Sequence, residues 1–464
     1  MMNELKVGDK IRLDIRKQGI NGEGIGYYNR LAIFVPGAIL KETVDCEIVE
    51  RRKTFAFAKI ESIVRVSTRR VEPPCEYYDE CGGCQMQHID YTEQLKIKQS
   101  ILKQAFARYT PLKKEELNIK NTLGMDDHFH YRNKSQMPFN NTNFGLALGL
   151  YKQNSNHFVY IDDCMVQTEM VNTINQKTLS LLRKNDLLAY DRTNRDGILL
   201  NLVTRHLEST DQASVTFIVR SYDERLKYVA RELMDEIPAV KSVSYSINRR
   251  KNILMFGDET TLIAGEPYIY DDFDGLEIRI SPDAFHQLNS KQTRVLYNTV
   301  NQALELKGNE TIVDAYSGIG ITTLLLAKQS GHVYGIDYSE ASIKDAKANA
   351  ETNGIENTTF IARHVEGAMP RFVSQGVEPD VVIVDPPRKG LDHKVINALL
   401  KLKPEKIIYI SCNPSTLAKN YKRFHRRYRL ESIQPVDMFP HTSDVESVNV
   451  LTRRKKDSKR RNHS

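Results

Sequence analysis

The sequence of 464 residues predicts an α/β protein, in which a small β-barrel and a central α+β domain precede an open, mostly parallel sheet. Three observations favour this fold class. Polar and apolar residues alternate near the start, the middle mixes strand and helix patterns, and after Gly275 strands and helices alternate. A chain of this length exceeds one hydrophobic core. We place the domains at residues 1–65, 66–275 and 276–452, followed by a basic tail at 453–464.

The first 65 residues carry repeated strand signals. From Lys10 to Arg16 charged and apolar side chains alternate, which is the period of a half-buried strand. The same signal recurs at 31–35, 43–49 and 54–60. Closure into a barrel would remove exposed strand edges. Cys46 is in phase with the apolar positions of its strand, so we expect it in the barrel core.

Basic residues are concentrated at the two ends of the chain. The net charge is +7, and residues 1–70 hold 14 Lys and Arg against 9 Asp and Glu. Residues 451–464 hold 7 against 1 and lack periodic apolar positions, so we expect a disordered tail that either binds phosphates or only adds solubility. The segment from Arg51 to Phe57 mixes basic and aromatic residues. This suits RNA contact, but a solvated turn with Phe55 and Phe57 in the barrel core explains it as well.

The start of the chain has no apolar signal segment, and no uncharged apolar run reaches 18 residues. We therefore expect a soluble, cytoplasmic protein away from membranes, and we expect a monomer. In such a compartment the six cysteines should be reduced thiols rather than disulfides.

Four cysteines have a spacing that suggests a metal centre. A Cys-Gly-Gly-Cys turn is preceded by one cysteine and followed by another far downstream: Cys75, Cys81, Cys84 and Cys164. Two thiolates separated by two residues can bind one metal, and soft sulfur ligands select zinc or an iron-sulfur cluster. The alternative is four unrelated thiols.

The central region begins with a strong helical pattern from Asp90 to Tyr109, with apolar residues at a period of 3.6, ended by Pro111. This helix could pack on the last domain. Further on, strands are predicted at 198–203, 215–219 and 243–247 and a helix at 221–235. Arg132 and Lys134, next to Tyr131, could contact RNA by stacking and phosphate binding.

A nucleoside site is predicted in the last domain. The strand 310–314 is followed by Tyr316, Gly318 and Gly320, and the next strand ends at Asp337. Glycines allow a ligand to approach the backbone, and the acid can bind ribose hydroxyls. Dinucleotide enzymes normally have a third glycine where this chain has Thr323. The pattern therefore favours S-adenosylmethionine over a nicotinamide cofactor, which stays as an alternative.

The strand 380–385 ends in Asp385, and two prolines and Arg388 follow. This arrangement presents a carboxylate in the crevice at the end of the sheet. Amino-directed nucleic-acid methyltransferases place an aromatic residue where Arg388 stands, so the sequence argues against that chemistry.

A cysteine and a glutamate are predicted at the same edge of the sheet. Cys412 follows the strand 406–410, and Glu446 precedes the strand 447–451. Ligands of open α/β folds bind at the carboxyl ends of the strands. Cys412 is therefore a candidate nucleophile, although a free cysteine is more often a small buried apolar residue. A surface carboxylate is the alternative for Glu446.

These motifs together resemble the RNA (uracil-5-)methyltransferases of the RumA/TrmA type nearly end to end. The motifs are Asp-Ala-Tyr-Ser-Gly-Ile-Gly, Asp-Pro-Pro-Arg, Ser-Cys-Asn-Pro and His-Thr-x-x-x-Glu, in that order. The resemblance implies a Rossmann-like class I methyltransferase domain that uses S-adenosylmethionine, a TRAM (OB-like) barrel and a 4Fe-4S cluster on the four cysteines, with zinc as the alternative. The barrel and the cysteines point to the RumA-like branch (RlmD/RlmCD type), whose substrate is ribosomal RNA.

The resemblance also implies residue roles. Cys412 would be the nucleophile and Glu446 the base, while Gln287, Tyr316, Asp337 and Asp385 would line the cofactor site with the two glycines. Many relatives have Phe and Cys where this chain has Tyr316 and Ser317. A thiolate that adds to carbon 6 of uracil makes carbon 5 nucleophilic, and a base must then remove the carbon-5 proton.

We expect large-subunit (23S) ribosomal RNA as the partner. The alternatives are transfer RNA, an amino-directed nucleic-acid methyltransferase and a non-enzymatic RNA-binding protein. Phe285 could hold the extruded uridine or fill the gap that it leaves. Arg388 is a further candidate RNA contact, and it could also favour the thiolate of Cys412.

Overall fold

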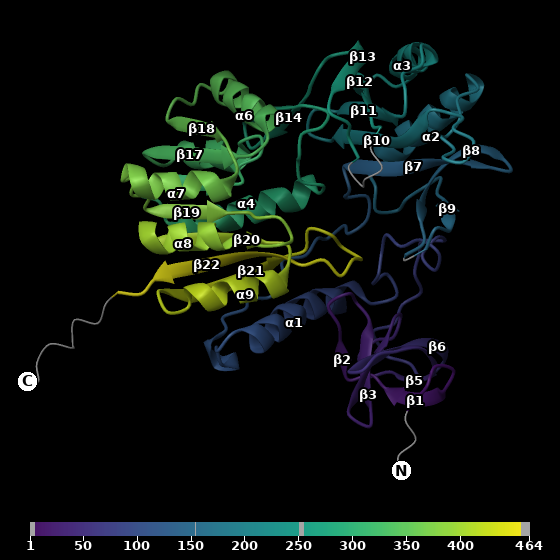
Figure 1. Ribbon diagram of the computed structural model, residues 1–464, viewed down its shortest axis with the longest axis horizontal. Helices are drawn as coiled ribbons and strands as arrows, with labels where there is room; N and C mark the ends of the chain where they lie inside the picture. Colours follow the sequence, from purple (N-terminus) through teal and green to yellow (C-terminus); the bar gives the residue numbers. More distant parts are fainter. Residues whose placement is uncertain (1–4, 154, 250–254, 456–464) are drawn as a thin grey trace, which may run out of the picture.

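The computed structural model describes residues 5–153, 155–249 and 255–455 and contains a barrel, a central sheet and a larger sheet (Figure 1). In the figure the barrel lies at lower right, the central sheet at upper right and the larger sheet on the left. Over the described ranges, the apolar stretch needed for a membrane-crossing helix does not occur. The tail expected at 453–464 lies outside the described residues from 456 onward.

The barrel contains six strands in the order β1-β5-β6-β4-β3-β2. They are β1 (Lys10–Asp14), β2 (Lys17–Gln18), β3 (Gly24–Tyr28), β4 (Leu31–Val35), β5 (Thr43–Arg51) and β6 (Phe55–Arg65). Cys46 is fully buried in the barrel core, as predicted. Phe55 and Phe57 are not in that core: they are half-buried and pack on each other and on Phe34, while Ala56 and Ala58 point inward. The alternation of β6 therefore places both rings on the outer face.

The central sheet has seven strands in the order β13-β12-β11-β10-β7-β8-β9. Its elements are β7 (Lys134–Thr142), β8 (Gly145–Tyr151), β9 (Phe158–Tyr160), α2 (Glu169–Lys184), β10 (Leu199–Leu207), β11 (Gln212–Val219), α3 (Arg225–Glu236), β12 (Val240–Ile247) and β13 (Thr260–Gly265). Buried residues of α2 and α3 share one core with the sheet. The hairpin of β14 (Ile269–Phe273) and β15 (Leu276–Ile280) leads to the last domain.

The larger sheet has the order β18-β17-β16-β19-β20-β22-β21. Its strands are β16 (Thr311–Ala315), β17 (His332–Asp337), β18 (Thr358–Ala362), β19 (Val381–Val384), β20 (Lys406–Ser411), β21 (Tyr428–Val436) and β22 (Glu446–Arg453). Strands β16 to β20 are parallel, β22 is antiparallel to β20, and β21 pairs antiparallel with β22 at the edge. The order reverses between β16 and β19, and ligands bind at such a switch point.

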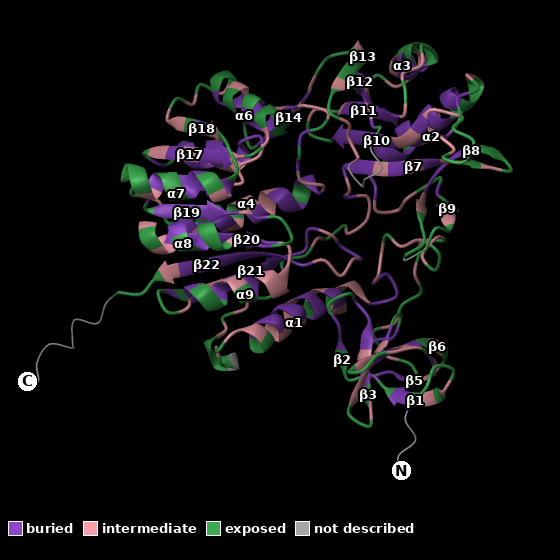
Figure 2. Ribbon diagram, viewed as in Figure 1, coloured by how far each residue is buried: buried purple, intermediate pink, exposed green. Residues whose placement is uncertain are grey.

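Helices cover both faces of this sheet, so its central strands β16, β19 and β20 are almost entirely buried, whereas the edge strand β18 is partly exposed (Figure 2). The six helices that follow the hairpin are α4 (Ser290–Leu304), α5 (Ile321–Ala327), α6 (Glu340–Thr352), α7 (Val365–Gln375), α8 (His393–Leu402) and α9 (Pro414–Phe424). Helices α7, α8 and α9 contribute to one core and α4, α5 and α6 to cores on the other side.

Helix α1 (Tyr91–Tyr109) confirms the helix predicted from Asp90 to Tyr109, with Asp90 as its N-cap, and a short 3-10 helix, η1 (Lys114–Glu116), follows it. Although α1 comes before the central domain in sequence, it packs against α9, and its buried apolar residues belong to the core of the larger sheet. The chain after η1 then runs along β21, with bridges from Ile119 to Ile433 and from Leu123 to Val436. Residues 86–124 are therefore part of the support of the larger sheet.

A buried ion pair connects α1 to the loop between β21 and β22. Lys98 Nζ lies 2.5 Å from Asp437 Oδ1, and both side chains are fully buried. Lys98 also donates to the carbonyl oxygen of Phe439 at 2.9 Å, and the Tyr91 hydroxyl donates to Asp437 Oδ2 at 2.8 Å. Because the charges are shared among several hydrogen bonds, burial is tolerated. These contacts hold the start of the loop between β21 and β22 against α1.

Candidate functional site

Cys412 and Glu446 are brought together by the pairing of β20 with β22. The last pair of this antiparallel ladder is Ser411 with Ser447, so Cys412 and Glu446 are the next residues on the two strands. Residues opposite each other on such strands are within side-chain reach. Cys412 is half-buried and Glu446 is buried. The structure therefore places the two predicted catalytic residues at one edge of the sheet.

The loop that presents Cys412 is fixed by the cap of the following helix. The side chain of Asn413 accepts hydrogen bonds from the amides of Ser415 at 3.0 Å and Thr416 at 3.3 Å. Pro414 occupies the first turn of α9, where its missing N–H is not needed. The Asn-Pro pair after the cysteine thus ends the strand and begins the helix at a defined place.

Burial and the acidic groups around Cys412 disfavour its thiolate form in the free protein. Burial, followed by the acidic neighbours Glu446 and Asp385, raises the pKa of Cys412 to about 12, and Arg388 acts in the opposite direction. Burial and then Asp385 also raise the pKa of Glu446 well above its ordinary value. A positive charge brought to this site would therefore favour the anionic form of both groups.

Arg388 is the arginine of the Asp-Pro-Pro-Arg motif and lies beside the reactive pair. Its guanidinium Nη2 is 2.9 Å from Asp444 Oδ1. Its carbonyl oxygen accepts from Asn413 Nδ2 at 3.2 Å, so the backbone of the motif is bound to the loop that carries Cys412. The side chain is largely exposed, so an anionic ligand could reach it beside its pair with Asp444.

The predicted nucleoside site has its backbone geometry in place. Asp337, half-buried at the end of β17, accepts from the amide of Gly318 at 3.1 Å and from that of Ser339 at 2.8 Å. Gly320 has φ of +89°, and a Cβ atom there would lie 3.0 Å from Ala346 Cβ. Only glycine fits both conditions. Burial raises the pKa of Asp337.

A cavity connects this turn with Asp385 and the 285–287 segment. The residues that line it are Phe285, His286, Gln287, Thr293, Tyr297, Asp314, Tyr316, Ser317, Gly318, Ile319, Ile321, Thr322, Asp385 and Ile410. The hydroxyls of Tyr316 and Ser317 are buried there and have no hydrogen-bond partner in the described part of the chain. Unpaired buried polar atoms are costly, so a polar ligand fits this cavity. Burial, followed by Asp314, raises the pKa of Asp385 to about 7.

Thr323 explains why the third glycine is missing. Its hydroxyl donates to Asp314 Oδ2 at 2.7 Å, and both side chains are buried. Burial raises the pKa of Asp314 to about 6. The position therefore holds a buried acid through a hydroxyl, which a glycine could not supply.

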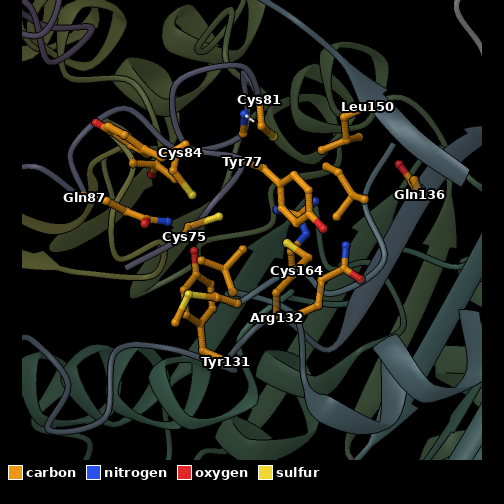
Figure 3. A pocket seen from close by; sticks show the side chains of 17 residues that line it. Cys75, Tyr77, Cys81, Cys84, Gln87, Tyr131, Arg132, Gln136, Leu150 and Cys164 are labelled. Carbon is orange, nitrogen blue, oxygen red and sulfur yellow. Dashed lines mark hydrogen bonds between the residues drawn. The ribbon is translucent and has the colours of Figure 1, made fainter. Parts of the chain in front are cut away.

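The four predicted metal ligands line a single cavity of about 250 Å³: Cys75, Cys81, Cys84 and Cys164. Figure 3 shows their side chains around it, together with Tyr77, Tyr131 and Arg132. None of the four is in a disulfide. Among the described residues, however, no group of three or more His, Cys, Asp or Glu side chains has a geometry that could hold a metal ion. The common cavity and the sulfur donors fit a thiolate-bound group, whereas the thiols are not preset in a coordination geometry.

The residues predicted to contact RNA fall in different environments. Phe285 is 65% exposed at the mouth of the cofactor cavity. Arg132 is half-buried and lines the cysteine cavity. Lys134 is buried, and burial, followed by Arg205 and Arg132, lowers its pKa to about 7. Lys134 is therefore not a surface cation in this structure.

Sequence patterns did not indicate the residues that hold the 437–445 loop. Lys98 and Gln94 stand at polar positions of a helix and resemble solvent-facing residues, yet both are fully buried. Tyr297, which lines the cofactor cavity from α4, was also missed. A buried partner on a distant segment leaves no periodic signal in the sequence, so only the structure reveals these contacts.

Comparison with known proteins assigns the chain to a family. Residues 90–454 match the family described as tRNA (Uracil-5-)-methyltransferase, and residues 4–60 match the TRAM domain. A Bacillus anthracis protein named "Uncharacterized RNA methyltransferase" is 41% identical, with 97% of this chain and 98% of the relative covered. A protein of the same name from Enterococcus faecalis is 40% identical, with 97% and 99% covered.

A solved structure is similar over nearly the whole chain. It is the tRNA (uracil-54, C5)-methyltransferase of Pyrococcus abyssi in complex with S-adenosyl-L-homocysteine. It is 27% identical, the TM-score is 0.75, and 95% of this chain and 100% of that one are covered. The similarity therefore includes the barrel and the central sheet as well as the larger sheet.

Proposed function

Because the chain belongs to the tRNA (uracil-5-)-methyltransferase family and is an S-adenosylmethionine-dependent RNA methyltransferase, we propose that it methylates carbon 5 of uridine in large-subunit ribosomal RNA. The observation that carries the proposal is the facing position of Cys412 and Glu446 beside Asp385. A thiol next to a basic carboxylate is what an attack on carbon 6 of uracil and a later removal of the carbon-5 proton require.

The proposed reaction uses these groups in sequence. The Cys412 thiolate forms a bond to carbon 6, and the displaced electron pair makes carbon 5 nucleophilic. Carbon 5 would take the methyl group of S-adenosylmethionine, whose methyl–sulfur bond would break with its electron pair left on sulfur as S-adenosylhomocysteine. The Glu446 carboxylate would then remove the carbon-5 proton. The electron pair of that C–H bond restores the double bond between carbons 5 and 6, and the sulfur leaves as thiolate.

The raised pKa values suit this order of events. In the free protein, burial followed by nearby acidic groups raises the pKa of both Cys412 and Glu446, which favours their protonated forms. Arg388 favours the thiolate, and the sulfonium charge of bound S-adenosylmethionine would act in the same direction. A carboxylate whose pKa is raised is also a stronger base once it is ionised. Binding of S-adenosylmethionine would therefore favour attack of the Cys412 thiolate on the uracil ring.

The cofactor site is proposed to be formed by Asp337 at the ribose, the Gly318–Gly320 turn, and Gln287, Tyr316 and Asp385 around the sulfonium end. The proposal is supported by the cavity that Gln287, Tyr316, Gly318 and Asp385 line. It is also supported by the buried hydroxyls of Tyr316 and Ser317, which lack hydrogen-bond partners in the described part of the chain. Phe285, exposed at the mouth, is placed to contact the extruded uridine.

The four cysteines are proposed to bind a 4Fe-4S cluster, with zinc as the alternative. The support is their shared cavity and soft donor set. An absorbance spectrum of anaerobically purified protein tests this. A broad visible band with stoichiometric iron is expected, and colourless protein with stoichiometric zinc would contradict the cluster.

Ribosomal RNA is proposed because the barrel and the four cysteines together resemble the ribosomal branch. Transfer RNA is the second candidate, since the similar Pyrococcus abyssi enzyme acts on it according to its name. The protein is proposed to act as a monomer on folded RNA, with the barrel as an RNA-binding module.

The test is methyl transfer to separate transcripts of 23S ribosomal RNA and to transfer RNA, followed by nucleoside analysis. We expect 5-methyluridine in the ribosomal transcript, and mass mapping of ribosomal RNA from a deletion strain should show loss of the same nucleoside. Product in transfer RNA alone would favour the second candidate. A methylated base amino group would contradict uridine-5 chemistry.

A further inference from the structure

The loop that ends at Glu446 also forms part of the wall of the cysteine cavity. We call residues 437–445 the base loop and residues 81–84 the cysteine turn. Thr442 of the base loop lines the cavity, and the Tyr131 hydroxyl, from the same cavity, donates to the carbonyl oxygen of Pro440 at 3.0 Å. The base loop thus connects the wall of the cysteine cavity to Glu446.

The backbone of His441 is held from both sides. Its amide donates to Gln94 Oε1 at 3.0 Å, and its carbonyl oxygen accepts from the amides of Gln85 and Met86, each at 2.9 Å. His441 has φ of +66°, in the left-handed region that non-glycine residues adopt uncommonly. The segment that directly follows the cysteine turn holds this residue on one side.

Gln85 joins the cysteine turn to the base loop through its side chain as well. Its Nε2 donates to the carbonyl oxygen of Gly82 at 3.0 Å, within the turn. Its Oε1 accepts from the amide of Ser443 at 3.3 Å, three residues before Glu446. One half-buried amide group therefore bridges the two segments.

We infer that Gln85 is a positioning residue for Glu446, and that the conformation of the cysteine turn sets the position of the base loop. The inference rests on the proposed role of Glu446 as the base. Because the Gln85 side chain donates to Gly82 in the turn and accepts from Ser443 in the base loop, a rearrangement of the cysteine turn, such as one that accompanies binding of a thiolate-bound group, would be transmitted to the base loop. The cysteine site would then influence proton removal without touching the substrate.

The first experiment follows the covalent protein–RNA adduct in Gln85→Ala. Adduct formation depends on Cys412, so its rate in Gln85→Ala should stay within about twofold of the wild-type rate. Adduct decay depends on Glu446 and should slow at least tenfold, because small displacements of a catalytic group cost up to about 100-fold. Gln176→Ala is the matched control, since Gln176 Nε2 donates to the carbonyl oxygen of Asp162 at 2.9 Å but does not contact the base loop. Equal decay in the two variants would overturn the positioning role.

The second experiment measures hydrogen exchange of the peptide 437–446 without substrate, together with the metal content. Wild-type protein is compared before and after treatment with a chelator and a reductant. We expect at least fivefold faster exchange after treatment, and no further increase in Gln85→Ala, because coupled changes are not additive. Gln85→Glu keeps the acceptor for Ser443 but cannot donate to Gly82, so its exchange should not respond to treatment. Unchanged exchange in wild type would overturn the coupling.

These outcomes are separable from a failure of the proposed function. If Glu446→Gln accumulates no adduct, the role of Glu446 is wrong and the inference falls with it. If that variant accumulates adduct while Gln85→Ala decays like Gln176→Ala, only the inference is wrong.

Discussion

Cys412 and Glu446 are the first residues beyond the last pair, Ser411 with Ser447, of two neighbouring antiparallel strands. The nucleophile and the base are thus placed by one strand pairing, although 34 residues separate them in sequence. A shift of one residue in register would turn the side chains of one strand to the opposite face. The core residues of β20 and β22 therefore also fix the geometry of the reaction.

Replacing Glu446 with Gln should trap the covalent intermediate. Attack and methyl transfer can proceed, but the amide cannot remove the carbon-5 proton, so turnover should fall at least about 100-fold. Denaturing gels should show a protein–RNA adduct, which Cys412→Ala should abolish. Asp444→Asn, a nearby acidic control, should not accumulate adduct. Wild-type turnover by the glutamine variant would show that Glu446 is not the base.

The affinity for S-adenosylmethionine should depend on the ionisation of Asp385. Its pKa of about 7 in the free protein means that the carboxyl is protonated at lower pH. Binding of a sulfonium favours the anion, so affinity should fall about tenfold per unit as pH decreases from 7 to 5 and should level off above 7. Calorimetry across this range measures the effect.

The uncharged product S-adenosylhomocysteine provides the control for Asp385, because it lacks the sulfonium. Its affinity should change little with pH, and Asp385→Asn should remove the pH dependence for S-adenosylmethionine. Equal pH profiles for the two ligands would place Asp385 away from the sulfonium.

Replacing Arg388 with Gln should slow adduct formation by roughly tenfold at neutral pH, because this cation lowers the pKa of Cys412. Below a pKa of about 12 the thiolate fraction rises tenfold per pH unit. Wild type and variant should therefore show parallel profiles between about pH 6 and 8.5, measured by rapid-quench kinetics. Lys389→Gln removes an adjacent exposed cation and should change the rate less than twofold. A variant rate equal to wild type would exclude Arg388 from thiol activation.

Lys98→Met should destabilise the protein by about 3–5 kcal/mol, since it leaves the buried Asp437 without its cation. Lys96→Met, on the exposed side of the same helix, removes only a surface pair with Glu93 and should cost less than about 1 kcal/mol. Urea unfolding, monitored by hydrogen exchange of the α1 amides, measures the free energy of unfolding of both variants. Equal losses would mean that the buried pair does not hold the helix to the base loop.

Much of the larger sheet could be predicted from sequence because its strands are continuous apolar runs that end in functional residues. The strand 332–337 was predicted with its observed bounds, and α1 begins one residue after the predicted Asp90. Strands buried on both faces give strong local signals. For the same reason Cys412, Asp337 and Asp385 could be assigned to one edge before the structure was known.

Tertiary contacts determine the side-chain environments that the sequence patterns did not predict. Phe55 and Phe57 alternate with alanines, and pairing in the barrel turned the small residues inward rather than the rings. Lys134 was expected at an RNA surface, but its strand is covered and the side chain is buried. The bridge made by Gln85 joins residues 358 positions apart, and no local pattern encodes such a contact.

Tritium release from carbon 5 of uridine tests the central claim most directly. Substrate RNA carrying tritium at carbon 5 of its uridines would be incubated with the protein and S-adenosylmethionine, and tritium in water would be compared with methyl groups in RNA. The account predicts one tritium released per methyl transferred, and none with Cys412→Ala. Methyl transfer without tritium release would contradict methylation at carbon 5.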